Sequence, residues 1–79
     1  MMIRVKLIAN YRDQLPPEAK NGIVELDVPD GTSVREAISR FAIPLDDTSV
    51  IVLNGLTVDL NTPLKAGDVV SAFSAIAGG

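Results

Sequence analysis

The chain has 79 residues and a net charge of −3, with 47% apolar but only 4% aromatic residues. This length and composition predict a single domain over residues 1–79 with an aliphatic core, and they exclude a disordered chain. The acidic balance makes nucleic acid an unfavourable partner, because a phosphate-backbone binder needs excess positive charge. The absence of Cys and His excludes disulfides, thiolate or imidazole catalysis, and metal sites built from these residues.

The chain carries no segment that predicts membrane insertion or export. Its longest apolar run, "VIVL" at residues 50–53, is far shorter than the ~20 residues that a membrane span requires. The N-terminus alternates charged and apolar residues and has no signal-peptide core. We therefore expect a soluble, cytoplasmic protein with no membrane partner.

The first predicted strand covers residues 2–10, where apolar and charged residues alternate with the period of two of a half-buried strand. One face of this strand carries Ile3, Val5, Leu7 and Ala9. The other face carries Arg4 and Lys6, with Ile8 as its apolar exception. A polar connection over residues 11–22 follows, with one helical turn expected at 17–20. Residues 23–28 alternate again and predict a second strand, antiparallel to the first.

The period then changes to that of a helix. An apolar stripe at i, i+3, i+4 and i+7 is formed by Val34, Ala37, Ile38 and Phe41. Ser33 and Glu36 match the capping box S-x-x-E, although Thr32 is a competing N-cap. The helix should end by Ala42, because the residue before Pro44 is disfavoured in the α region.

Residues 50–54, "VIVLN", are continuously apolar up to Leu53 and rich in β-branched side chains, which predicts a central strand buried on both faces. Asn54 and Gly55 are a strong signal for a two-residue hairpin turn, with a returning strand at 56–60. Residues 69–76 predict the last strand, which continues directly into a flexible tail at residues 76–79.

The order strand, strand, helix and three further strands predicts an α+β domain with one main helix across one face of a mixed sheet of four to five strands. This is the β-grasp, or ubiquitin-like, arrangement. In it the first and last strands lie parallel at the centre, which suits their apolar character.

The remaining polar residues do not predict a catalytic or metal site in this chain. Four acidic residues could be imagined as a hard-cation site, but no EF-hand spacing surrounds them; they are Asp13, Glu18, Asp46 and Asp47. The segment "PDGTS" lacks the pattern of a phosphate-binding loop, and the serines have no His to act as a base. We expect no bound metal or cofactor.

Several segments, taken in order, carry a resemblance to a known family: "MIRVKLIANYRD", "VPDGTSVREAI", "VLNG", "DLNTPLKAGDVV" and the ending "AGG". Together they span the chain and resemble the MoaD/ThiS family of ubiquitin-like sulfur carriers. The length and the connection over residues 10–22 are closest to the small, sulfur-carrier subunit of molybdopterin synthase. That type often has Phe-Pro-Pro before the tail, whereas here Ser74 and Ala75 follow Phe73, so a thiamine-type carrier stays an alternative.

The resemblance implies that the reactive group is the carboxylate of Gly79. In the family, a ubiquitin-activating-type enzyme uses ATP to adenylate this carboxylate, and sulfur then replaces AMP to leave a thiocarboxylate. The tail residues read by that enzyme would be Gly78, Ala77 and Ile76. Glycine suits such a tail because a chain without Cβ can thread a narrow channel. The carrier is then a co-substrate and not an enzyme, and the catalytic groups belong to its partners.

Two residues are candidates for partner contact. Ile8 breaks a charged strand face, and Phe73 corresponds to the family's contact aromatic before the tail. An exposed apolar patch commonly marks a docking surface, here for the adenylating enzyme and for the large subunit of molybdopterin synthase or an equivalent acceptor. Filling of the core is the equally weighted alternative for both residues.

Three classes of function follow from these observations. The first is sulfur transfer for molybdenum or tungsten cofactor biosynthesis. The second is a ubiquitin-like modifier conjugated to lysine through the same C-terminus. The third is an interaction domain with an inert tail.

Overall fold

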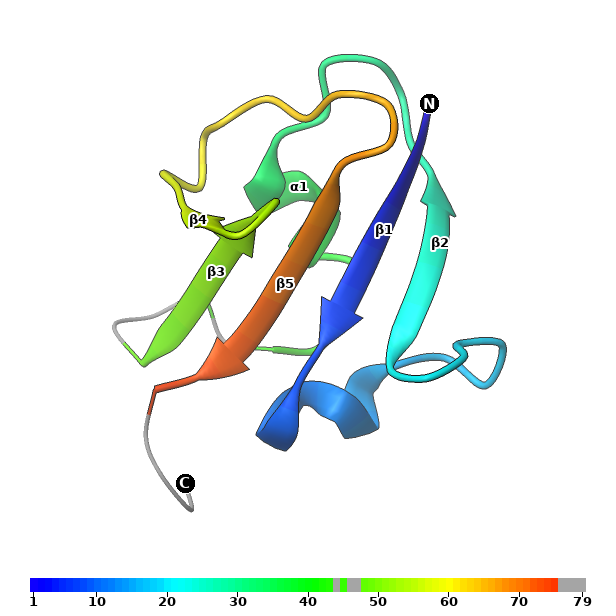
Figure 1. Cartoon of the computed structure of the whole chain (residues 1–79), viewed down its shortest axis with the longest axis vertical. Helices are drawn as coiled ribbons and strands as arrows, with labels where there is room; N and C mark the ends of the chain where they lie inside the picture. Colours follow the sequence, from blue (N-terminus) through cyan, green and yellow to red (C-terminus); the bar gives the residue numbers. More distant parts are fainter. Residues whose placement is uncertain (44, 46–47, 76–79) are drawn as a thin grey trace.

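Five strands form one mixed sheet, in the order β2-β1-β5-β3-β4, and a short α-helix lies across one face of it (Figure 1). This arrangement, seen in a computed structural model that describes residues 1–43, 45 and 48–75, confirms the predicted α+β, β-grasp class. The face without the helix is called the uncovered face below.

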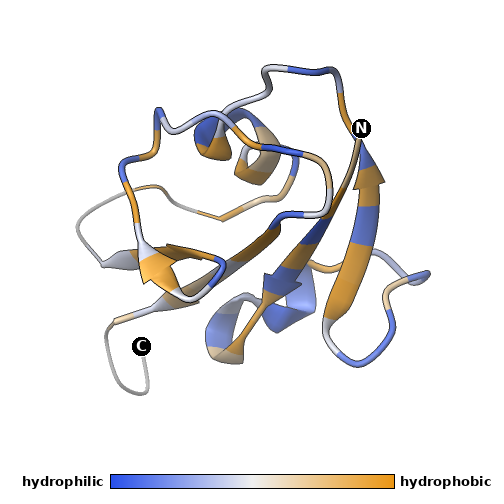
Figure 2. Ribbon diagram, turned by 45° about the horizontal axis from the view of Figure 1, so that its top comes forward, coloured by the Kyte–Doolittle hydropathy of each residue, from blue (hydrophilic) through white to orange (hydrophobic). Residues whose placement is uncertain are grey.

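The centre of the sheet is built from the first and last strands, as predicted. β1 (Met2–Leu7) pairs in parallel with β5 (Val69–Ser74) and antiparallel with β2 (Ile23–Asp27). The predicted alternation in β1 is confirmed, because Ile3, Val5 and Leu7 are buried while Arg4 and Lys6 are exposed. Figure 2 shows hydrophobic and hydrophilic residues alternating along these strands.

The hairpin at Asn54 and Gly55 is confirmed and is a two-residue turn. It joins β3 (Ser49–Leu53) to β4 (Leu56–Thr57), with φ angles of 50° at Asn54 and 89° at Gly55. Positive φ at both central residues is the type I′ geometry that matches the twist of the flanking strands. β4 is only two residues long, shorter than the strand expected over residues 56–60.

The expectation that residues 50–54 form a central strand buried on both faces is wrong. β3 lies between β5 and the short edge strand β4, and within β3 only Ile51 is buried. The neighbouring valines, Val50 and Val52, face the uncovered side of the sheet, where no element of the described residues lies over them. Their β-branched character therefore reflects sheet propensity and not burial on both faces.

The helix α1 (Val34–Ile38) begins with the predicted capping box. The Ser33 hydroxyl accepts from the Glu36 N–H at 3.2 Å, and the Glu36 carboxylate accepts from the Ser33 N–H at 3.1 Å. Hydrogen bonding of the Glu36 carboxylate to the Ser33 backbone N–H first, and to the Ser33 side chain second, holds the pKa of Glu36 below its ordinary value of 4.5. The helix ends before Ala42, as expected.

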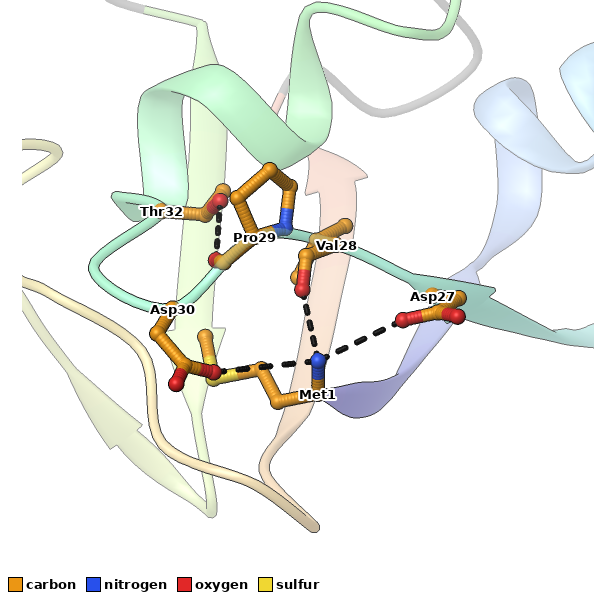
Figure 3. A network of polar contacts seen from close by, with 6 residues as sticks. All are labelled: Met1, Asp27, Val28, Pro29, Asp30 and Thr32. Carbon is orange, nitrogen blue, oxygen red and sulfur yellow. Dashed lines mark hydrogen bonds and ion pairs between the residues drawn. The ribbon is translucent and has the colours of Figure 1, made fainter.

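Thr32 is not the N-cap. Figure 3 shows its hydroxyl donating to the Pro29 carbonyl at 2.7 Å, which closes the turn between β2 and α1. In the same view the amino nitrogen of Met1 lies 2.7 Å from the Val28 carbonyl oxygen and 3.3 Å from an oxygen of Asp27. The start of β1 is thus held against the end of β2.

The connection after β1 differs from the prediction at two points. A 3₁₀ helix, η1 (Ala9–Gln14), begins where strand was expected, and Ala9 has a φ of 54° that turns the chain out of the sheet. Around residues 17–20 the structure has a hydrogen-bonded turn, closed by the Ala19 N–H and the Pro16 carbonyl, and no helix. The 3₁₀ helix could not be read from the sequence because its polar residues follow no helical period.

The core lies between the sheet and α1, with Val34, Ala37 and Ile38 of the helix fully buried against strand residues such as Val5 and Val70. Within the described ranges, no helix is long and apolar enough to cross a membrane.

Candidate functional site

The predicted reactive tail, Ile76, Ala77, Gly78 and Gly79, lies outside the described residues. The structure does describe the point from which the chain continues towards it. β5 ends at Ser74, and the Ala75 N–H donates to the Thr48 carbonyl at 2.6 Å. The described chain therefore ends directly after the central strand β5, next to the start of β3 and to η1 (Figure 1).

Phe73 points to the uncovered face. Its neighbours in β5 on the core side, Ala72 and Val70, are fully buried, whereas Phe73 is half-buried and outside the core cluster. Since successive strand residues face opposite sides, Phe73 lies on the side away from α1. Its direct antiparallel partner is Val50.

Ile8 lies beside Phe73 on the same face. It is 37% exposed, and its N–H donates to the Ala72 carbonyl at 3.0 Å. This bond extends the parallel register that pairs Lys6 with Ser71 and Leu7 with Ala72. The structure thus brings together the two predicted contact residues and adds a third, so that Ile8, Phe73 and Val50 form an apolar row across three strands.

Neither Ile8 nor Phe73 belongs to the core cluster, so the alternative that these side chains fill the core is excluded. Their role in partner contact stays a prediction. Val50 was missed because its place depends on the register between β3 and β5, which are separated by 15 residues of chain. The signal available in the sequence was its spacing from the Asn54 turn.

The end of the sheet that carries the apolar row is braced by η1. Tyr11, a buried residue of η1, forms a hydrogen bond with Ser49 between their hydroxyl oxygens at 2.9 Å. This bond ties η1 to the start of β3 and keeps Tyr11 satisfied in an apolar setting. The sequence reasoning missed this residue, whose signal was a lone aromatic within a polar stretch.

The opposite end of β5 is fixed by a polar clamp. The Asn54 amide donates to Asp68 at 3.0 Å and its oxygen accepts from the Val69 N–H at 2.9 Å. The other oxygen of Asp68 accepts from the Lys65 N–H at 2.8 Å. The segments "VLNG" and "AGD" that carried part of the resemblance therefore have a structural role, because they hold the hairpin to the start of β5.

No metal site is visible in the described part of the chain, where no three acidic side chains gather closely enough to hold an ion. Asp46 and Asp47, two of the four acidic residues considered above, lie outside that part.

Comparisons with known proteins identify the architecture. SAMP1 from Haloferax volcanii matches over 100% of both chains, with a TM-score of 0.77 and 24% identity. A Pyrococcus furiosus protein assigned as subunit 1 of molybdopterin converting factor matches over 95% of this chain and 98% of its own, with a TM-score of 0.73 and 26% identity.

A third solved structure is a complex of subunits 1 and 2 of molybdopterin-converting factor from Helicobacter pylori. The match covers 100% of both chains, with a TM-score of 0.63 and 26% identity. No curated protein matches this chain. The sequence model of the ThiS family matches residues 5–79. The chain therefore belongs to the ThiS family of ubiquitin-like, ThiS/MoaD-type sulfur carriers.

Proposed function

We propose that this protein carries sulfur as a thiocarboxylate on Gly79 and donates it in molybdopterin biosynthesis. The observation that carries the proposal is the family match, which extends through residue 79 and so includes the Gly-Gly ending. The two solved structures at 26% identity, one of subunit 1 of molybdopterin converting factor and one of the complex of its subunits 1 and 2, favour the molybdopterin pathway over the thiamine pathway.

The chemistry begins with activation, because a carboxylate is a poor electrophile until it has a good leaving group. A carboxylate oxygen of Gly79 attacks the α-phosphorus of ATP, and pyrophosphate leaves. Hydrosulfide then attacks the acyl carbon, AMP leaves with the bonding electron pair, and loss of the S–H proton gives the thiocarboxylate. The resulting thiocarboxylate is the nucleophile that delivers sulfur to the acceptor molecule.

The acid-base groups for these steps belong to the partners. The sequence contains no His or Cys, and the lowered pKa of Glu36 is explained by the capping box. In this proposal the protein is a co-substrate and binds no cofactor, and ATP is used by the adenylating enzyme.

Two partners follow from the proposal: a ubiquitin-activating-type adenylating enzyme and a large synthase subunit. The second is supported by the Helicobacter pylori structure, in which a protein similar to this chain is complexed with subunit 2. The apolar row offers a docking surface to either partner, since it adjoins the point where the chain continues towards the tail.

Intact mass spectrometry of protein purified from its native host tests the proposal. We expect a species in which one oxygen of the Gly79 carboxylate is replaced by sulfur. Conjugates to lysines of other proteins, without this species, would instead favour a ubiquitin-like modifier. A terminus that is always unmodified would contradict both functions and leave an interaction domain.

A further inference from the structure

The uncovered face changes in polarity along the strands. The apolar row lies at the end where β5 leads to the tail, and the next row of paired residues is Ile23, Lys6, Ser71 and Val52. One pair further on, Arg4 lies opposite Glu25. Lys6 is therefore the cation nearest to the apolar row on β1, two residues from Ile8.

In the part of the chain that the structure describes, Lys6 has no compensating charge beside it. Its cross-strand neighbours are Ile23 and Ser71, whereas the nearest carboxylate by register, Glu25, lies opposite Arg4. Within residues 1–43, 45 and 48–75, neither Lys6 nor Arg4 forms an ion pair, and both are exposed. The uncovered face thus presents a free positive charge on a protein whose net charge is −3.

A partner that covers the apolar row must also cover Lys6. Two residues along a strand span about 7 Å. A standard interface buries about 800 Å² on each partner, which corresponds to a patch roughly 30 Å across. Covering an ammonium group without supplying a counter-charge leaves it partly desolvated and unpaired, which weakens association.

We infer that the adenylating enzyme recognises this face with an apolar side chain against the apolar row and a carboxylate over Lys6; the inference rests on the proposed function. Lys6 then acts in specificity, because an enzyme with a neutral or basic surface at this point is rejected. The occupant is the adenylating enzyme because, in the proposed function, Gly79 is activated by this enzyme before any sulfur is transferred. The apolar row lies at the end of β5 from which the chain continues towards Gly79.

The test compares charge reversals at two exposed lysines. Lys6→Glu places the new charge next to the apolar row, and Lys65→Glu makes the same change in the turn before β5, at the opposite end of the sheet. The measurement is ATP–pyrophosphate exchange by the adenylating enzyme of the native host, as a function of carrier concentration. Lys6→Arg serves as the conservative variant, and the melting temperature of each variant checks its folding.

We expect Lys6→Glu to raise the KM for the carrier roughly tenfold at ~0.1 M salt, as reversal of a steering charge does. The difference should shrink at ~1 M salt, where the Debye length falls from about 10 Å to about 3 Å. The KM for Lys65→Glu should stay within about twofold of the wild-type value. Lys6→Arg keeps the positive charge, so its KM should stay close to that of the wild type.

Equal KM values for Lys6→Glu and Lys65→Glu would overturn the inference and leave the proposed function intact. The same holds if Lys6→Glu impairs only the later sulfur transfer, since the face would then be read by the acceptor. Failure of the wild type itself to support exchange would contradict the proposed function, and the inference with it.

Discussion

At the scale of residues, the apolar row depends on which side of the sheet each side chain faces. Alternation along a single strand was enough to predict Ile8 as an unusual apolar residue on a charged face, and Phe73 came from the family resemblance. Val50 could not be predicted in the same way, because it joins the row only through pairing with Phe73. Pairing between strands distant in sequence is a tertiary property that local patterns do not encode.

Replacement of Ile8 or Phe73 by Asp should separate docking from folding. Both residues lie outside the core cluster, so the melting temperature should change little. An apolar residue at the centre of an interface commonly contributes about 2 kcal/mol or more, so partner affinity should fall roughly 30-fold. Isothermal titration with the adenylating enzyme measures this loss.

Leu56→Asp is the matched control for the docking variants. Leu56 is an apolar residue with 70% exposure, but it belongs to β4 and not to the apolar row. Its replacement should leave partner affinity within about twofold of the wild type, as is usual outside an interface centre. Equal losses at Leu56 and at Phe73 would mean that the apolar row is not the docking surface.

Glu36 should make the stability of the protein sensitive to acid. Its folded-state pKa is lowered by the bonds from Ser33, so its ionised form is stabilised on folding. This contribution is fully present above the ordinary value of 4.5 and is lost as the pH falls through the lower folded value. Gln can also fill this position of a capping box, so Glu36→Gln should retain the helix but lose less stability on acidification.

Urea unfolding at a series of pH values from about 7 to about 3 measures the effect of Glu36. Glu18→Gln is the control, since Glu18 is an exposed carboxylate outside the capping box. If the wild type and Glu36→Gln lose stability in parallel, the capping carboxylate does not account for the acid sensitivity.

At the scale of elements, local signals predicted most of the sheet and the start of the helix. The capping box marked α1, and the Asn54-Gly55 pair marked the hairpin, because both depend on side chains acting on their own backbone. η1 and the place of β3 beside the short edge strand β4 escaped prediction. The first is held by Tyr11 across the fold, and the second depends on strand order.

Asn54 should be more important for stability than its exposure suggests. Asn54→Ala removes two side-chain hydrogen bonds to the start of β5. It also places alanine, which tolerates positive φ less well than asparagine, at a φ of 50°. Together these effects should lower the free energy of unfolding by about 2 kcal/mol. Asn54→Gly keeps the backbone conformation and should recover the part due to strain. Chemical denaturation of both variants separates the two contributions.

Asn61→Ala provides the control for the Asn54 variants. Asn61 is exposed in a turn, and its backbone N–H donates to the Asp59 carboxylate at 2.8 Å. Its replacement should lower the free energy of unfolding by no more than about 0.5 kcal/mol. A similar cost at both positions would contradict the clamp between the hairpin and β5.

At the scale of the whole molecule, the residues that stabilise the fold and the surface that is proposed to bind partners lie on different sides of the sheet. The core is closed between α1 and the two central strands, and β5 leads from it directly towards the Gly-Gly ending. The uncovered face carries the apolar row and Lys6, which are the features that a partner can read. The sequence resemblance predicted the tail as the reactive part of the protein. The composition of the neighbouring uncovered face could be identified only from the structure.

The most direct test of the central claim is incubation of the protein with ATP and its cognate adenylating enzyme, followed by intact mass spectrometry. The account predicts an acyl-adenylate on Gly79, which a sulfur donor converts to the thiocarboxylate, and no adduct on a variant that lacks Gly79. An unmodified wild-type protein, or equal modification of the shortened variant, would contradict it.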